Sequence, residues 1–145
     1  MTLADGPGDE PLLERRAGRG IILDPDRRVL MIHGVDPDDP DRGGFWWTPG
    51  GGVEDHESVP EGTKRELWEE LGLRVDDLGS VVLHRVGEFP FGGRWIRQSE
   101  EFFIVEVDAG FEPRPRHFEA IEKAAIRDMR WLDPGELGAL ADPFY

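Results

Sequence analysis

The stretch GGVEDHESVPEGTKRELWEELGL, from Gly51 to Leu73, decides the fold that we expect for this chain. Its centre places Glu66, Glu69 and Glu70 within five residues. On an α-helix, residues three and four positions apart share a face, so these carboxylates would lie together and repel one another. Clustered carboxylate oxygens suit hard divalent cations such as Mg2+ or Mn2+. The stretch therefore predicts a helix whose acidic face meets a cation.

The limits of this helix are marked in the sequence. Ser58 followed three residues later by Glu61 is the pattern of an N-terminal capping box, and Pro60 is tolerated in the first turn. Gly72 stands where a left-handed C-terminal cap is expected. An apolar stripe with a spacing of four residues would face the core, and it consists of Val59, Thr63, Leu67 and Leu71.

The residues that precede the helix are expected to fold against it. The three glycines at 50–52 predict a loop whose backbone can approach a ligand or a metal closely. Glu57 lies just before the helix, where its carboxylate can reach Arg65 in a charge-assisted pair. Such a pair would hold the loop against the helix.

Length and composition indicate one globular domain. The 145 residues suffice for a sizeable core, and 38% of them are hydrophobic. Residues 1–12 are rich in glycine, proline and acidic groups. We therefore expect a flexible N-terminal tail over residues 1–12 and a single domain over residues 13–145.

The net charge and the lack of cysteine argue against several classes of protein. A formal charge of -14 disfavours a protein that binds duplex nucleic acid or a membrane surface, because no excess of Lys and Arg is available for phosphates. Without Cys there are no disulfides, thiolate zinc sites or cysteine nucleophiles. The sequence has no long apolar stretch, and it does not begin with a basic segment followed by an apolar one. The cytoplasm is therefore the expected compartment.

Apolar patterns on both sides of the helix predict a sheet. We expect a hairpin from strands at 15–24 and 28–34, a second hairpin from strands at 80–89 and 96–107, a strand at 127–132 and a closing helix from Pro134. The acidic segment 35–44 is expected to be a solvated loop, because it lacks the regular ligand positions of a calcium loop.

Two groups of residues are candidates for binding substrate. The first is the aromatic run with Trp46 and Trp47, of which one or two rings are expected in the core, while an exposed ring could stack on a nucleobase. The second is the tip of the later hairpin, where Arg94 and Arg97 could contact phosphate or base. Solvated loop residues would give the same pattern at that tip.

The stretch that opens this section resembles the Nudix box, the signature of the Nudix hydrolase family. Gly51 is followed by five variable positions, by Glu57, by seven further positions and then by the run from Arg65 to Leu73. This arrangement matches every fixed position of the box. The resemblance extends less specifically over about residues 15–140.

The resemblance implies an α/β fold, a Nudix-type α/β/α sandwich with a mixed β-sheet between helices. It implies a pyrophosphohydrolase, a hydrolase acting on phosphorus-containing anhydrides. Its substrate would be a nucleoside diphosphate linked to another moiety, with water attacking phosphorus. The implied cofactor is Mg2+ or Mn2+, which would neutralise the phosphates and lower the pKa of the water. The implied partner is a small nucleotide-type molecule, and a homodimer is common in the family.

The resemblance also assigns roles to residues of the box. Catalytic roles fall to Glu66, Arg65 and Glu57, with Glu66 as the first candidate for general base, although some members take the base from a loop outside the box. The implied metal ligands are Glu66, Glu69, Glu70, the backbone carbonyl of Gly50 or Gly51, and Glu122, with Glu119 and then Glu100 or Glu101 as alternatives to Glu122.

Other classes of function remain open from the sequence. A Nudix-fold domain that binds nucleotides without turnover is one alternative, and the intact set of Arg65 and the three box glutamates disfavours it. An acidic amphipathic helix in an unrelated domain is another. The chemistry of isopentenyl diphosphate isomerase, which has a related fold, is disfavoured by the lack of Cys. The substrate stays open among damaged nucleoside triphosphates, ADP-ribose, sugar nucleotides and dinucleoside polyphosphates.

Overall fold

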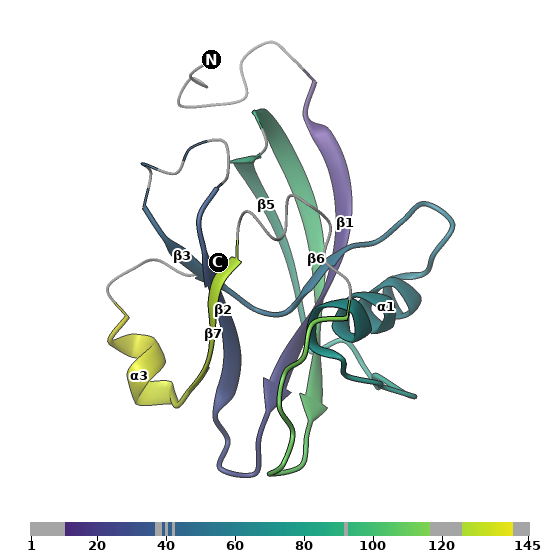
Figure 1. Cartoon of the computed structure of the whole chain (residues 1–145). Coiled ribbons are helices and arrows are strands. Elements are labelled where there is room, and N and C mark those ends of the chain that lie inside the picture. Colours follow the sequence, from purple (N-terminus) through teal and green to yellow (C-terminus); the bar gives the residue numbers. More distant parts are fainter. Residues whose placement is uncertain are drawn as a thin grey trace.

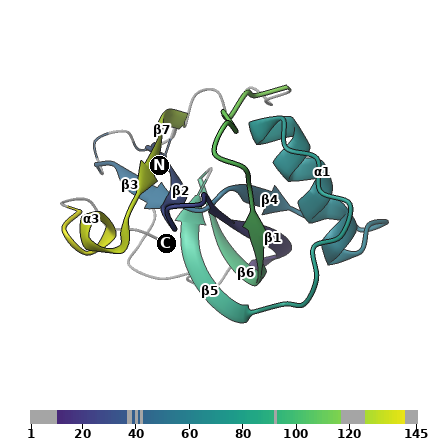
Figure 2. The ribbon, with the colours of Figure 1, turned by 90° about the horizontal axis from the view of Figure 1, so that it is seen from below.

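A mixed β-sheet with helices beside it forms the body of the molecule. The computed structural model describes residues 11–36, 39, 41, 43–91, 93–116 and 126–140. In chain order its elements are β1 (Leu13–Leu23), β2 (Val29–Gly34), β3 (Phe45–Trp47), β4 (Gly50–Gly52), α1 (Val59–Leu71), β5 (Leu83–Phe91), β6 (Arg94–Glu106), β7 (Ile126–Leu132) and α3 (Pro134–Gly138). Figures 1 and 2 show α1 and α3 on opposite sides of the strands.

Strand β1 is the centre of the sheet. The strand order is β3-β2-β1-β6-β5, with β4 paired to β1 and β7 paired to β2. β1 runs parallel to β6 over its whole length, from Leu13 opposite Ile96 to Leu23 opposite Glu106. β5 and β6 form the expected antiparallel hairpin. The parallel pairing makes the sheet mixed, as the family resemblance implies.

Strands β1 and β2 separate soon after their turn. Their pairing has a single register position, Leu23 with Val29, and β2 then pairs with β3 and β7 instead. Figure 1 shows the two strands meeting at the bottom and diverging upward. The space that β2 vacates along the middle of β1 is taken by β4, which pairs with residues 17–19.

Two clusters of apolar side chains form the hydrophobic core. The larger lies under α1 and consists of Ile22, Leu30, Leu67, Leu71, Leu78, Phe103 and Val105. The smaller consists of Met31, Trp46 and Leu132, with α3 packing on it through Leu137. The larger cluster holds α1 against β1 and β6, the arrangement on which the candidate site depends.

Most of the predicted elements are confirmed, with corrections at the glycines and at the hairpin tip. The prediction of a loop at 50–52 is wrong, because these residues form β4 through backbone pairing that needs no side chains. The turn expected over 89–95 is shorter, since β5 continues to Phe91 and β6 begins at Arg94.

Among the described residues, no helix has the length and apolar character needed to cross a membrane.

Candidate active site

Local sequence signals fix both ends of α1. The Ser58 hydroxyl accepts a hydrogen bond from the backbone N–H of Glu61, at 3.2 Å, and donates one to the Glu61 carboxylate, at 2.9 Å. Glu61 therefore binds the hydroxyl and not the backbone N–H of Ser58, so only half of the predicted capping box forms. At the other end Gly72 has a φ of 68°, the left-handed cap that was predicted.

The three carboxylates of the box lie on the side of α1 that faces β4. Glu66 is 7% exposed and Glu70 is 3% exposed, whereas the side chain of Glu69 is 26% exposed. Two of the three carboxylates are therefore buried, which the helical spacing alone did not indicate. The reason is β4, whose glycines let the backbone lie directly against the carboxylates.

Glycine is required at two positions of β4. A Cβ on Gly51 would lie 2.7 Å from the carboxylate carbon of Glu66. Gly50 has a φ of 131°, a conformation that L side chains rarely adopt, and its N–H donates to the Glu70 carboxylate at 3.3 Å. Backbone and carboxylate oxygens are thereby brought into one small region.

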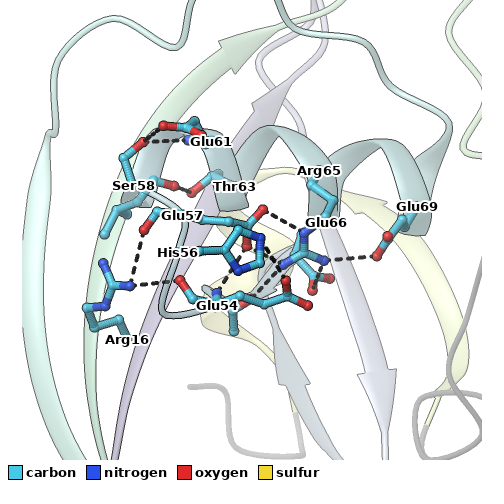
Figure 3. A network of polar contacts seen from close by, with 12 residues as sticks. Arg16, Glu54, His56, Glu57, Ser58, Glu61, Thr63, Arg65, Glu66 and Glu69 are labelled. Atoms are coloured by element: carbon cyan, nitrogen blue, oxygen red, sulfur yellow. Dashed lines mark hydrogen bonds and ion pairs between the residues drawn. The ribbon is translucent and has the colours of Figure 1, made fainter.

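Arg65 joins the loop and the helix through one guanidinium (Figure 3). Its Nε and Nη2 donate to the two carboxylate oxygens of Glu57, at 2.8 and 2.9 Å. Its Nη1 donates to Glu66 at 3.1 Å and to Glu69 at 3.2 Å, and Nη2 also donates to the Gly52 carbonyl at 3.1 Å. The ion pair expected between Glu57 and Arg65 is present.

A second arginine fixes the loop before the helix. The Nη2 of Arg16 on β1 donates to the carbonyls of Glu54 and Glu57, at 2.9 and 3.2 Å. The backbone N–H of Glu54 donates to the Glu57 carboxylate at 3.0 Å. Figure 3 shows these contacts converging on the loop from the side of β1. The loop is therefore held from both β1 and α1.

The charges around Arg65 set the ionisation of its partners. The hydrogen bonds from Arg65 lower the pKa of Glu57 to about 2 against the opposing effect of burial, so Glu57 stays ionised near neutral pH. The same bonds raise the pKa of Arg65. Burial raises the pKa of Glu66 although Arg65 opposes it. A buried carboxyl with a raised pKa is the kind of group that can take up a proton.

The donor set fits a hard divalent cation. Three carboxylates and the backbone carbonyls of β4 offer only oxygen, the ligand that Mg2+ and Mn2+ prefer. In the described part of the chain no three acidic or histidine side chains converge as a metal site. Arg65 contacts one oxygen each of Glu66 and Glu69. Glu122 and its alternative Glu119 lie outside the described residues.

The structure disfavours one of the predicted substrate contacts, Trp46, and leaves Trp47 and Arg94 accessible. Trp46 is 6% exposed and packs with Met31 and Leu132, which speaks against its contact with substrate. Trp47 is half-buried, with its ring 5.1 Å from that of Phe45. Arg94 is exposed on β6.

The positive charge of Arg97 already has two acidic partners. Its guanidinium contacts Glu14 at 3.3 Å and Glu88 at 3.1 Å. These contacts disfavour the predicted role in binding phosphate.

Residues on β1, β5 and β6 form an ion-pair group that the sequence did not predict. Glu100 is 4% exposed and contacts Arg19 at 2.9 Å and Arg85 at 2.8 Å. Arg19 also donates to the Thr48 carbonyl, just before β4, at 3.3 Å. The pairing leaves Glu100 a poor candidate for a metal ligand. No pattern in the sequence of β6 singles out Glu100 or names its partners.

The chain belongs to the Nudix family, because the model of the NUDIX domain matches residues 14–144. The match covers every described element except the start of β1. Members of this family are pyrophosphohydrolases that act on phosphoanhydride bonds. The protein is therefore a Nudix pyrophosphohydrolase.

Relatives and solved structures agree with this assignment. The chain is 35% identical over 118 residues to a Mycobacterium tuberculosis protein named "Putative 8-oxo-dGTP diphosphatase 2", covering 79% of this chain and 77% of the relative. It is 26% identical over 158 residues to the RNA pyrophosphohydrolase of Erythrobacter litoralis, covering 98% and 90%. The fold resembles that of the MutT protein from Methanosarcina mazei, with a TM-score of 0.63, 21% identity and coverage of 93% and 88%.

Proposed function

We propose that this protein hydrolyses a pyrophosphate bond of a nucleotide-type substrate with the help of Mg2+ or Mn2+. The observation that carries the proposal is the group formed by Glu57, Arg65, Glu66 and Glu69 against the glycine backbone of β4. It gathers hard oxygen donors beside a backbone that only glycine can provide.

The residues of the box have separate roles in this proposal. Glu66, Glu69, Glu70 and a carbonyl of Gly50 or Gly51 would hold the metal, which when bound supplies charge neutralisation and a more acidic water. Glu66 is the proposed general base, since its burial favours uptake of a proton. Arg65 and Glu57 position the loop and the helix. Glu122 is proposed as a further ligand.

A nucleoside triphosphate is the first substrate class to examine. The Mycobacterium tuberculosis relative is named for 8-oxo-dGTP, and the Erythrobacter litoralis relative is named for RNA, whose 5′ end can carry a triphosphate. These names support the class and do not select a base. The experiment is a screen for release of phosphate and pyrophosphate over nucleoside triphosphates, ADP-ribose, sugar nucleotides and dinucleoside polyphosphates, each with Mg2+ and with Mn2+.

We predict that Glu66→Gln and Glu70→Gln each lower kcat by a factor of 100 or more in this screen, because each removes an anionic oxygen donor. The measurement is steady-state hydrolysis of the best substrate, with circular dichroism to check folding. Glu106→Gln is the matched control, since it removes one exposed carboxylate at the end of β6 and should leave kcat unchanged. Near wild-type hydrolysis by both site variants contradicts the assignment. No metal-dependent turnover by the wild type favours a silent nucleotide-binding domain.

A further inference from the structure

The outer edge of β5 has no partner among the described strands. β5 is nine residues long and is the last strand of the sheet, paired with β6 alone. An open strand edge presents backbone N–H and C=O groups that can pair with a further strand, so proteins cover such edges or keep them short. At about 3.4 Å per residue, β5 offers an edge of about 30 Å. β5 is thus longer than a typical strand, and the described residues leave its edge uncovered.

Exposed apolar side chains gather along this edge. Among the described residues, the exposed large apolar side chains other than Leu13 all lie on β5, in the two residues before it or on the neighbouring strand β6. They are Val81, Val82, Leu83, Val86 and Ile104. Ile104 lies two residues beyond Phe102, the partner of Leu83, on the same face of the sheet. Apolar side chains grouped in this way mark an interaction surface more often than single ones do.

Helix α1 leaves β5 uncovered on the face where Val86 lies. Phe103 of β6 packs under α1, so Ser99 and its partner Val86 point to the same side of the sheet. α1 packs on β1 and β4, whereas β5 forms the border of the sheet beyond β6 (Figure 2). Val86 is therefore 56% exposed. A second strand could be added to this edge without meeting α1.

The sequence of β5 fits a second copy of itself. In an antiparallel pair around a two-fold axis perpendicular to the sheet, residues opposite each other share a face, so both α1 helices stay on one side. With the axis at Val86, this residue lies opposite Val86 of the second copy, which brings two exposed apolar side chains together. On either side of this pair, His84 lies opposite Glu88 of the other copy, which sets an imidazole against a carboxylate.

The other face of the strand is also complementary with the axis at this position. Leu83 lies opposite Phe89, so two apolar side chains meet. Arg85 lies opposite Gly87, where a Cβ would meet no described atom within 4 Å. The glycine therefore leaves room for the long arginine side chain. The pairing ends before Pro90, which has no N–H to donate to a further strand.

An axis at any neighbouring residue is less favourable. With the axis at Arg85 or at Glu88, two like charges lie opposite each other, and this arrangement destabilises a sheet. With the axis at Gly87, Val86 lies opposite Glu88, so an apolar side chain meets a carboxylate. An axis at His84 would leave most of β5 unpaired. The pattern of charged and apolar residues therefore selects the axis at Val86.

We propose that this protein forms a dimer in which two β5 strands pair antiparallel about a two-fold axis at Val86. The partner is a second copy and not another protein, because one strand supplies both members of every pair described above. A two-fold contact is closed, so it covers the edge in both copies and does not extend into a fibre. The inference concerns association between copies and does not depend on the proposed function.

The test uses two variants of one residue, Val86→Lys and Val86→Glu. Sedimentation equilibrium measures the dissociation constant of the dimer for the wild type, for each variant alone and for an equimolar mixture of the two variants. Each variant alone places like charges opposite each other at the axis, so we expect its dissociation constant to rise about tenfold or more above that of the wild type. The mixture places lysine opposite glutamate, so we expect it to recover dimers that contain one chain of each kind.

Two controls separate this contact from general hydrophobic association and from loss of folding. Leu13→Glu changes an exposed apolar residue on β1, two strands away from β5, and should leave the dissociation constant unchanged. Circular dichroism and thermal unfolding check that the Val86 variants fold, which we expect because more than half of this side chain is exposed.

Four results would overturn the inference. They are a wild type that stays monomeric at the highest concentration reached, single Val86 variants that dimerise as tightly as the wild type, a mixture that associates no more tightly than its components, and equal weakening by Leu13→Glu. The first result would mean that something other than a second copy covers the edge of β5.

Discussion

At the scale of single residues, Arg65 shows how one side chain can organise a site. Its planar guanidinium donates in several directions at once, to Glu57, to the box glutamates and to the backbone of β4. A lysine in its place would offer a point charge that cannot reproduce the paired contact with Glu57. The identity of this residue therefore matters more than its charge.

We predict that Arg65→Lys lowers the free energy of unfolding by about 1–2 kcal/mol, because the two-point contact with Glu57 is lost at a site about a quarter exposed. Urea denaturation at neutral pH measures this change. Arg97→Lys is the matched control, because Arg97 also bridges two carboxylates but lies in solvent. The control should change stability by less than about 0.5 kcal/mol. Equal effects of the two variants would contradict the special role of Arg65.

Sequence spacing was sufficient for several residue contacts and insufficient for others. The pairing of Glu57 with Arg65 was predictable, because the helix cap between them fixes how the chain turns back. The pairing of Glu100 with Arg19 was not, since Arg19 reaches it from β1, 81 residues away in the chain. The burial of Glu66 was also missed, because it depends on how closely β4 approaches α1.

At the scale of elements, β4 is the feature that distinguishes the structure from the sequence expectation. A strand of three glycines has no side-chain pattern from which it could be predicted. It forms because β2 diverges from β1 and leaves the backbone groups of residues 17–19 available for pairing. The lack of side chains then lets α1 lie directly on the strand.

We predict that Gly50→Ala lowers the free energy of unfolding by about 3 kcal/mol or more. Its Cβ would lie 2.1 Å from the Gly18 carbonyl oxygen, and the φ of 131° is strained for alanine. Thermal or urea denaturation measures the loss. Gly79→Ala is the control, because Gly79 also has a positive φ of 69° but open space around it, so the cost should be about 1 kcal/mol. Similar costs would show that close packing at Gly50 is unimportant.

At the scale of the whole molecule, the parallel pairing of β1 and β6 joins the two halves of the fold. The antiparallel hairpin of β5 and β6 was predictable from a short connection, whereas this pairing links segments about 80 residues apart and has no local signal. The buried ion pair of Arg19 with Glu100 spans it. The stability of this pairing between β1 and β6 should therefore depend on the charge of Glu100.

We predict that Glu100→Gln lowers the free energy of unfolding by about 2–3 kcal/mol at pH 7, because it leaves two arginines without their partner. Burial raises the pKa of Glu100, but Arg19 and Arg85 outweigh it and lower the pKa below 4.5. The stabilisation is thus complete above pH 4.5 and is lost as the pH falls through the pKa of the folded state.

Urea denaturation of the wild type and of Glu100→Gln at pH 7, 5 and 3 measures this dependence. The difference between the two proteins should shrink toward pH 3, because the stabilisation by the ionised carboxylate is lost as the pH falls below 4.5 toward the lowered pKa of the folded state. Glu106→Gln, an exposed change on the same strand, should give a small difference at every pH. A difference for Glu100→Gln that grows toward acid would show that the pKa of Glu100 is raised.

The placement of Arg65 has a consequence for how the protein would acquire its metal. Because the guanidinium already lies between Glu66 and Glu69, the chain carries its own counter-charge and can reach the folded state before an ion arrives. Arg65 contacts one oxygen of Glu66 and one of Glu69, so a bound cation would share these carboxylates with the guanidinium. The repulsion between the two positive groups would lower the apparent affinity for the cation, and the stronger attraction of a double charge to the carboxylates favours doubly charged ions over singly charged ones.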